Sequence, residues 1–290
     1  MKQYLNEFWQ MGGYAQEDCV VLTDVYDRIA ADATACDCFA QAMAEYEKDA
    51  CDYPLLLTLA DRAAQCAGVH EYTAELLLYM CLSKALRERY REKGIDEAIF
   101  WNSMLDLKYK LEECKAVKGV IGSFVAGWFE GFFNMTRFAL GRLQFELVPF
   151  GHSYEKDGKT LTPDSKVINV HIPRTGTPLL PQACEEAYAQ AAAFFAKEID
   201  GDTAFVCESW LLYPENETIL GEKSNIVRFM KRYEILHHGI SKNKADLWRL
   251  FDTDEQHPDR LPTDTTARRR YAAHIKAGGK LGWGFGVFFA

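Results

Sequence analysis

The sequence predicts an α+β protein in which an all-helical N-terminal domain is followed by a domain built on a mixed β-sheet. Apolar residues recur at helical spacing up to about residue 140, and from Leu143 onward they alternate as in strands. A strand, a helical run and a second strand then follow between Val167 and Leu212. We therefore expect two domains, residues 1–140 and 141–290. No linker rich in Gly, Ser or Pro separates them, so we expect a broad contact between the two.

The first domain reads as a bundle of helices. Pro54 is suited to the first turn of a helix, and Gly68 and Gly94 follow apolar stripes at places where a helix ends. No strand-like alternation interrupts these stripes. The spacing predicts helices at 16–31, 55–66, 71–93 and 95–114.

The second domain begins where the period changes. Leu143, Phe145 and Leu147 fall on one face of a strand, and Asp157-Gly158 is a strong signal for a hairpin turn. Further strands are expected at 167–172, 203–212, 233–236 and 281–289, with helices at 182–198 and 225–232.

The last strand alternates large apolar residues with glycine. Gly282, Gly284 and Gly286 share one face and leave the backbone bare there. Two interpretations remain open: a ligand or a second chain approaches this face, or the face is flat and closely packed within the fold.

Composition and charge exclude several classes of protein. The 290 residues carry a formal net charge of −9, which argues against a nucleic-acid surface. The most apolar run, Gly119–Phe133, is too short to span a bilayer and contains Glu130, so no membrane partner is expected. Met1–Glu7 lacks the apolar stretch of a secretory signal, and a cytoplasmic location is expected. The oligomeric state is left open.

The nine cysteines are interpreted as reduced thiols. A zinc site is the competing interpretation, but no CxxC pair occurs and these residues lie in Ala- and Leu-rich helical runs. No metal is expected. The residues considered for such a site are Cys36, Cys38, Cys51, Cys66 and His70.

A polar stripe on the strand at 167–172 is the first indication of function. Ile168, Val170 and Ile172 fall on one face, whereas Asn169 and His171 fall on the other. An imidazole and an amide in a sheet are costly to bury unless they are hydrogen-bonded. A polar ligand or a polar network should therefore meet this stripe.

Six separate segments stand out, in this order along the chain: Leu140–Glu146, Val170–Pro173, Cys207–Leu212, Ser224–Ile226, Leu261–Thr265 and Gly284–Gly286. Together they resemble the segments of a bacterial family of acyltransferases. Its members pair a helical N-terminal domain with a GNAT-like C-terminal domain. The resemblance implies acyl-CoA as co-substrate and a small-molecule or peptide acyl acceptor.

The resemblance also implies where acyl-CoA would bind. The strand at 168–172 leads into Arg174, Thr175, Gly176 and Thr177, whose backbone N–H groups would hold the pyrophosphate at the start of the next helix. The usual Q/R-x-x-G-x-G/A loop is absent. Glu185 and Glu186, placed in the first helical turn, would repel a phosphate. Arg268–Arg270 would either contribute positive charge for the phosphates or form a solvated helix face, and the solvated face is the favoured interpretation. A protein that kept the fold as a binding or scaffolding module is the alternative.

Acyl transfer needs a base for the attacking acceptor, and His171 suits that role because an imidazole titrates near neutrality. Glu208, on the following strand, is a second base or a group that orients His171. Alternation places Cys207 and Ser209 on one face and Glu208 and Trp210 on the other, so only one pair shares a face with His171.

The remaining candidates have less defined roles. Cys207 or Ser209 paired with His171 would give a covalent acyl-enzyme, and Tyr233 is a candidate general acid. Asn169, Trp210 and Asn225 are candidates for contact with the acceptor, although Asn225 is also placed to cap its helix with Ser224.

Overall fold

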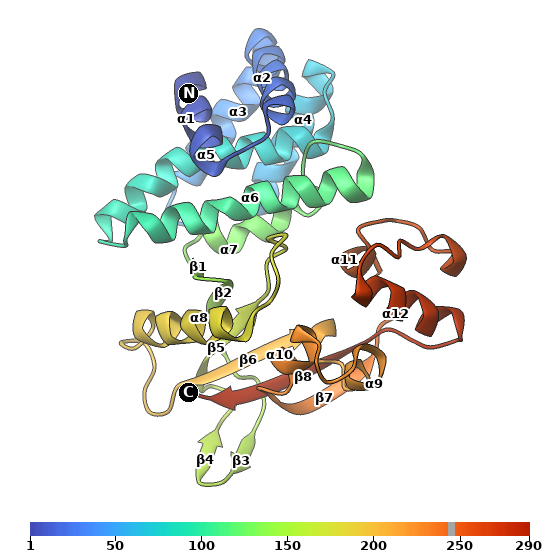
Figure 1. The fold of residues 1–290 in the computed structure, drawn as a ribbon. Helices are drawn as coiled ribbons and strands as arrows, with labels where there is room; N and C mark the ends of the chain where they lie inside the picture. Colours follow the sequence, from blue (N-terminus) through green and yellow to red (C-terminus); the bar gives the residue numbers. More distant parts are fainter. Residues whose placement is uncertain (243–246) are drawn as a thin grey trace. The chain divides into compact units, whose positions relative to one another are not determined.

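The computed structural model describes residues 1–242 and 247–290, and it has the α+β class that the sequence predicts (Figure 1). The chain divides into two compact units, Met1–Phe138 and Ala139–Ala290. The expected boundary at 140/141 lies two residues beyond this division.

The first unit is helical throughout, apart from the start of one strand at its end. The helix α5 is central, since it packs against α1, α2, α3, α4 and α6 and is buried on several sides. Its bounds and those of its neighbours are α1 Lys2–Gly12, α2 Gln16–Ala31, α3 Ala33–Tyr46, α4 Tyr53–Ala67, α5 Glu71–Glu92, α6 Glu97–Lys118, η1 Ala126–Phe129 and α7 Glu130–Phe133.

The helix ends follow the local signals in the sequence. The Asp52 side chain accepts a hydrogen bond from the backbone N–H of Leu55 at 3.0 Å, and Pro54 lies in the first turn of α4. Gly68 ends α4 in the left-handed conformation (φ 61°), which costs glycine little. The other predicted helices are confirmed to within a few residues.

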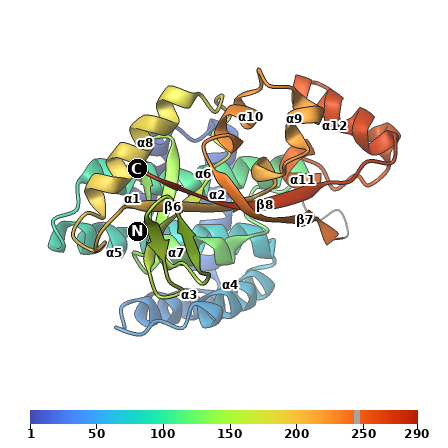
Figure 2. The ribbon, with the colours of Figure 1, turned by 90° about the horizontal axis from the view of Figure 1, so that it is seen from below.

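The second unit is built on a six-stranded sheet with the order β1-β2-β5-β6-β8-β7. Neighbours pair antiparallel in β2–β5, β6–β8 and β7–β8, and parallel in β5–β6. Figure 2 shows β8 lying between β6 and β7. The strands are β1 Arg137–Leu140, β2 Leu143–Pro149, β5 Lys166–His171, β6 Ala204–Ser209, β7 Glu234–Ile240 and β8 Gly282–Phe289, with the separate hairpin β3 Tyr154–Lys156 and β4 Lys159–Leu161.

Helices connect these strands. The helix α8 links the parallel strands β5 and β6, as a parallel pair requires. Ser209 ends β6 because its Oγ accepts a hydrogen bond from the backbone N–H of Leu211 and starts a 3₁₀ turn. The strand predicted to reach residue 212 is therefore shorter. The elements are α8 Pro181–Phe194, η2 Trp210–Leu212, α9 Asn216–Leu220, α10 Asn225–Met230, α11 Leu247–Phe251, η4 Pro258–Arg260 and α12 Thr266–Lys276.

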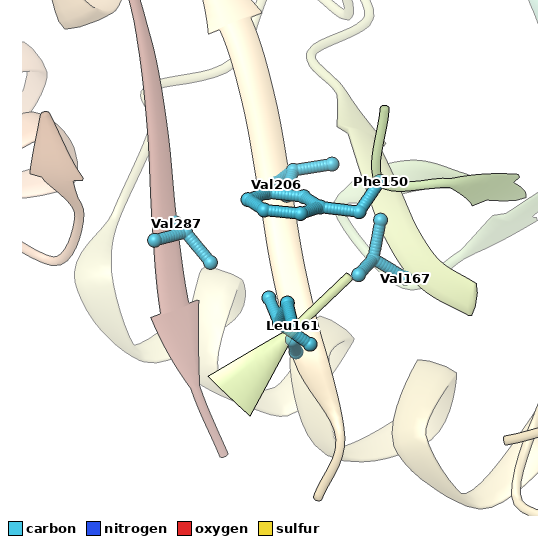
Figure 3. Packing of buried hydrophobic residues seen from close by; sticks show 6 residues of the cluster. Phe150, Leu161, Val167, Val206 and Val287 are labelled. Carbon is cyan, nitrogen blue, oxygen red and sulfur yellow. The ribbon is translucent and has the colours of Figure 1, made fainter. Parts of the chain in front are cut away.

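The sheet has two different faces. On the helix face, Tyr188 of α8 packs edge-on against Phe205 and Phe288. On the opposite face, called the hairpin face, Leu161 from the β3–β4 hairpin covers Val167, Val206 and Val287 (Figure 3). The predicted turn joins this hairpin: Asp157 (φ 51°) and Gly158 (φ 76°) both have the positive φ of a type I′ turn.

The glycines of β8 face the chain's own backbone and rings. A Cβ on Gly284 would collide with the carbonyl of Leu212, and one on Gly282 would collide with the ring of Tyr213. Within the described residues the close approach is thus made by η2 and its neighbours. The interpretation as a closely packed face is supported.

Candidate active site on the sheet of the second unit

The parallel strands β5 and β6 separate toward their carboxyl ends. In the described part of the chain they are joined at only two register pairs, Ile168 with Phe205 and Asn169 with Val206. Beyond these pairs β5 continues to His171 and β6 continues to Ser209. In open α/β sheets, ligands bind outside the carboxyl ends of parallel strands, where the connecting segments diverge. This opening is therefore the candidate site.

The register decides which candidates lie on the same face as His171. Because Asn169 is opposite Val206, residues two further along each strand, His171 and Glu208, share the hairpin face. Cys207 lies on the helix face instead, between two residues of the opposite orientation. Of the two predicted pairs, Cys207 and Ser209 do not share the face of His171, whereas Glu208 does; Trp210, which follows the end of β6 in η2, is not placed by this alternation.

His171 is held by a carboxylate on the neighbouring strand β2. Its Nε2 lies 3.2 Å from Oε2 of Glu146 and 3.4 Å from Nδ2 of Asn169. Both side chains of the ion pair are about one fifth exposed, at 21% and 19%. With the proton on Nε2 donated to Glu146, the lone pair of the ring is on Nδ1. A histidine oriented in this way by a carboxylate has the arrangement of a general base.

Glu208 does not hold His171 in this structure. It is exposed and lines a pocket of about 440 Å³ together with Ser209, Trp210 and Trp283. Trp210 is fixed from behind, since Asn216 Nδ2 donates to its carbonyl oxygen at 2.9 Å and its ring packs edge-on against Tyr271. Tyr271 OH in turn donates to Oδ1 of Asn216, which is fully buried.

Cys207 and Tyr233 are placed away from the opening. Cys207 is fully buried on the helix face, and burial raises the pKa of its thiol well above the ordinary value. The Tyr233 hydroxyl lies 3.0 Å from that of Tyr188, and burial raises its pKa as well. This environment does not favour Cys207 as a nucleophile or Tyr233 as an acid. The Oγ of Ser209 accepts a hydrogen bond from the backbone N–H of Leu211.

Arg174 is part of an ion-pair network. Its Nε and Nη2 donate to the two carboxylate oxygens of Asp252 at 2.9 and 2.6 Å, and Arg268 donates to the same carboxylate. Arg268 also donates to Asp264 at 3.0 and 3.1 Å. The Arg174 side chain keeps 35% of its surface exposed. Arg269 and Arg270 are exposed, as the interpretation of 268–270 as a solvated face predicts, but Arg268, only 15% exposed, departs from it.

The loop that follows β5 is ordered by side chains. Arg142 donates to the carbonyl oxygens of Pro173 and Thr177, each at 3.2 Å. The N–H of Thr175 donates to the Pro173 carbonyl and the N–H of Thr177 to the Thr175 hydroxyl. Gly176 has a φ of 74°, which favours glycine. Two of the N–H groups expected to hold a phosphate are therefore used within the loop.

The start of α8 is more favourable to an anion than the sequence predicts. The helix begins at Pro181, and its first turn contains no acidic residue. Glu185 and Glu186 therefore lie in the second turn, and Glu185 is paired with Arg232 at 3.3 Å. Both carboxylates therefore lie just beyond the first turn, in which the prediction had placed them, and their repulsion of a phosphate is weaker than expected.

Asn225 is the first residue of α10, after Ser224, and neither side chain makes the predicted cap hydrogen bond.

Two residues that contribute to the site were not singled out from the sequence. Glu146 was recognisable, since it alternates with Leu143, Phe145 and Leu147 on the opposite face of its strand. Asp252 had no local signal, because its partner Arg174 lies 78 residues away.

Neither a metal centre nor a membrane segment is evident where the structure is described. No group of three or more His, Cys, Asp or Glu side chains there is arranged to hold a metal ion. No helix within residues 1–242 and 247–290 combines the length and apolar character needed to cross a bilayer.

Comparison with protein families gives two matches that together span nearly the whole chain. Residues 138–288 match the GNAT-like C-terminal domain, and residues 3–135 match the N-acyltransferase N-terminal domain. No curated protein matches this sequence.

Several solved structures share the fold. An acyltransferase in complex with decanoyl-CoA and teicoplanin has 21% sequence identity and a TM-score of 0.65, over 98% of this chain and 99% of that one. An acyltransferase mutant in complex with octanoyl-CoA gives the same identity, TM-score and coverage. An acyltransferase in complex with decanoyl-CoA has 22% identity and a TM-score of 0.64, over 87% of this chain and 74% of that one.

Proposed function

This chain belongs to the family with a GNAT-like C-terminal domain, and on that premise we propose that it is an acyl-CoA-dependent acyltransferase. The acceptor is a small molecule or a peptide. The acyltransferases of similar fold were crystallised with decanoyl-CoA or octanoyl-CoA, which supports a thioester donor here. One of them also held teicoplanin, which supports a small-molecule acceptor.

One observation carries the proposal: the opening between β5 and β6 has an oriented histidine at its edge. His171 is the last residue of β5, beyond the last register pair, and Glu146 holds its ring. A purely structural strand has no need of an imidazole at this position. An acyl group lying in the opening would be within reach of a base on the hairpin face.

The chemistry follows from this arrangement. His171 accepts the proton that the acceptor amine or hydroxyl loses, while the acceptor atom forms a bond to the thioester carbonyl carbon. The C–S bond then breaks, and CoA leaves as the thiol after taking up a proton. The carboxylate of Glu146 stabilises the imidazolium that forms in between. The buried, protonated thiol of Cys207 favours this direct transfer over an acyl-enzyme.

Two features of the second unit would hold the phosphates of acyl-CoA. The first turn of α8 offers backbone N–H groups and the positive end of the helix dipole, and that turn itself contains no acidic residue. Arg174 uses one edge of its guanidinium on Asp252, and the guanidinium has further N–H donors. Thr175, Gly176 and Thr177 form the loop between these two features.

A scaffolding or binding protein without catalysis is the second candidate. It is favoured by the loop itself, in which Thr175 and Thr177 use their N–H groups internally and Arg174 is already paired. A GNAT-derived module that no longer binds acyl-CoA would have such a loop, in which the groups that could hold a phosphate are hydrogen-bonded within the protein.

Thermal-shift measurements with acyl-CoAs from acetyl to decanoyl separate the two candidates. A ligand that binds only the folded state raises the melting temperature by mass action. We expect a rise with at least one acyl-CoA, and a smaller one with desulfo or adenine-free fragments. A melting temperature unchanged by every acyl-CoA at millimolar concentration would favour the scaffold.

A further inference from the structure

The segment Leu261–Thr265 leads into the helix α12 and fixes the side chain of Arg268. The Thr265 hydroxyl accepts a hydrogen bond from the backbone N–H of Arg268 at 3.2 Å, and the Asp264 carboxylate accepts two from its guanidinium at 3.0 and 3.1 Å. Nε of Arg268 donates to the carbonyl oxygen of Leu250 at 3.0 Å, which joins α12 to α11 (Figure 1). Arg268 is therefore a cation held in one place.

Asp252 connects Arg268 to Arg174, in the loop that follows β5. Its Oδ2 accepts a hydrogen bond from Arg268, and its two oxygens accept one each from Nε and Nη2 of Arg174, at 2.9 and 2.6 Å. Two parallel hydrogen bonds fix the orientation of a guanidinium as well as its position. Only 14% of the Asp252 side chain is exposed, so solvent screens this pair weakly.

The backbone at Asp252 has an uncommon conformation. Its φ is 52°, in the left-handed region, which Asp and Asn adopt more readily than other residues with a side chain. Asp252 directly follows Phe251, the fully buried last residue of α11, and its N–H donates to the carbonyl oxygen of Trp248 at 2.9 Å. An aspartate thus suits this position by its backbone preference as well as by its charge.

The ion pair with Asp252 occupies one edge of the Arg174 guanidinium. A guanidinium has five N–H donors in a fixed plane, and Asp252 accepts from two of them. Within residues 1–242 and 247–290, Nη1 of Arg174 donates to no protein atom, and 35% of the side chain is exposed. The pair therefore fixes the direction of the edge that carries Nη1.

We infer that Asp252 is a positioning residue for the donor site: it holds one edge of the Arg174 guanidinium so that the other edge meets a phosphate of acyl-CoA. The inference rests on the proposed binding of acyl-CoA. Because Arg174 is already ordered, the binding of acyl-CoA does not include the cost of ordering this long side chain. Arg268 and Leu261–Thr265 contribute indirectly, by holding the carboxylate of Asp252 in place.

A positioning role and a plain counter-ion role of Asp252 predict effects of opposite sign. A counter-ion lowers the positive potential at Arg174 and competes with the phosphate, so removing its charge should tighten the binding of acyl-CoA. A positioning residue lowers the cost of ordering Arg174, so removing its charge should weaken that binding. The direction of the change in affinity therefore decides between the two roles.

The test measures the dissociation constant of decanoyl-CoA by isothermal titration calorimetry. Asp252→Asn is the main variant, since Asn tolerates the left-handed backbone. We expect it to raise Kd about three- to tenfold, the scale of ordering one long side chain. In the Arg174→Ala background the same substitution should leave Kd unchanged or lower it, because no guanidinium remains to be held. Asp259→Asn removes a carboxylate that is paired with Lys276, outside this network, and should leave Kd unchanged.

A second variant, Asp252→Gly, removes the carboxylate entirely and keeps the left-handed backbone at little cost. It should weaken the binding of decanoyl-CoA at least as much as Asp252→Asn does. The melting temperature of each variant without ligand shows whether it is folded.

Two results would overturn the inference. In the first, decanoyl-CoA binds the folded Asp252→Asn or Asp252→Gly variant as tightly as the unaltered chain, or more tightly. In the second, Asp252→Asn weakens binding equally with Arg174 and with Ala at position 174, as a structural role of Asp252 requires. If the unaltered chain does not bind decanoyl-CoA, the proposed function fails, and this inference fails with it.

Discussion

His171 Nε2 lies 3.2 Å from Oε2 of Glu146, although the two residues belong to different strands and are 25 positions apart. The pairing of β2 with β5 places Gln144 opposite His171 and Glu146 opposite Asn169, so the contact runs diagonally across the sheet. Two adjacent β-strands are a rigid support for such a pair. The imidazole is therefore preorganised before any substrate binds.

Replacing His171 with Ala should lower turnover by roughly a hundredfold or more, which is the usual contribution of general acid–base catalysis. Binding of acyl-CoA should survive, because the imidazole is not among the groups expected to hold phosphate. Steady-state kinetics measures the turnover of the variant, and thermal shift with the same acyl-CoA measures whether it still binds the donor. Loss of binding together with loss of turnover would indicate a structural role for His171.

Replacing Glu146 with Gln should reduce kcat and leave KM for acyl-CoA nearly unchanged, since the carboxylate acts by holding His171 and stabilising its charged form. The shorter Glu146→Asp variant keeps the charge and should recover part of the rate. Equal rates for both variants and the unaltered protein would contradict the positioning role. Glu155→Gln, in the exposed hairpin, is the control.

Cys207→Ser should retain turnover under direct transfer and abolish it if the thiol carries the acyl group. The thiol should also resist alkylation, since burial raises its pKa and keeps it protonated. Iodoacetamide labelling of the native protein followed by peptide mass mapping should modify the exposed Cys36 and Cys66 first. Early labelling of Cys207 would show that this thiol is accessible after all.

Arg174→Ala should weaken acyl-CoA binding by about tenfold, the scale of one hydrogen bond to a charged group. Binding of acyl-CoA to this variant should also depend less on the salt concentration, because the ion pair between residue 174 and a phosphate of acyl-CoA is removed. We expect a smaller effect from Arg268→Ala, since that side chain is only 15% exposed and its donors are used on Asp252 and Asp264. Titrations of each variant with acyl-CoA at two salt concentrations measure the affinity and its salt dependence. A larger loss of affinity in Arg268→Ala than in Arg174→Ala would indicate that Arg268 binds the phosphate.

Glu75→Gln should stabilise the protein, and the effect should grow with pH. Burial and the neighbouring Asp61 raise the pKa of Glu75 to about 8. A folded-state pKa above the unfolded one means that stability is full below about pH 4 and is lost as pH rises toward 8. The difference in melting temperature between variant and parent should therefore increase from pH 4 to pH 8. A constant difference would show that Glu75 titrates normally.

The helices, strands and turns of this fold can be predicted from residues that are close together in the sequence. Asp52 and Pro54 mark the start of a helix and Gly68 marks its end, because caps act within a few residues of the chain. The Asp157-Gly158 turn has the same character. The polar stripe of Asn169 and His171 was likewise visible, since alternation along one strand needs no partner to be read.

Only the tertiary structure decided how these elements meet. The pairing of Asn169 with Val206 brings Glu208, and not Cys207, onto the face of His171, because a shift of one residue in register would exchange the two faces. The partners of His171 and Arg174 are Glu146 and Asp252, 25 and 78 residues distant. Local spacing carries no information about such pairs. They form because sheet register and loop packing, set by the whole core, bring opposite charges together.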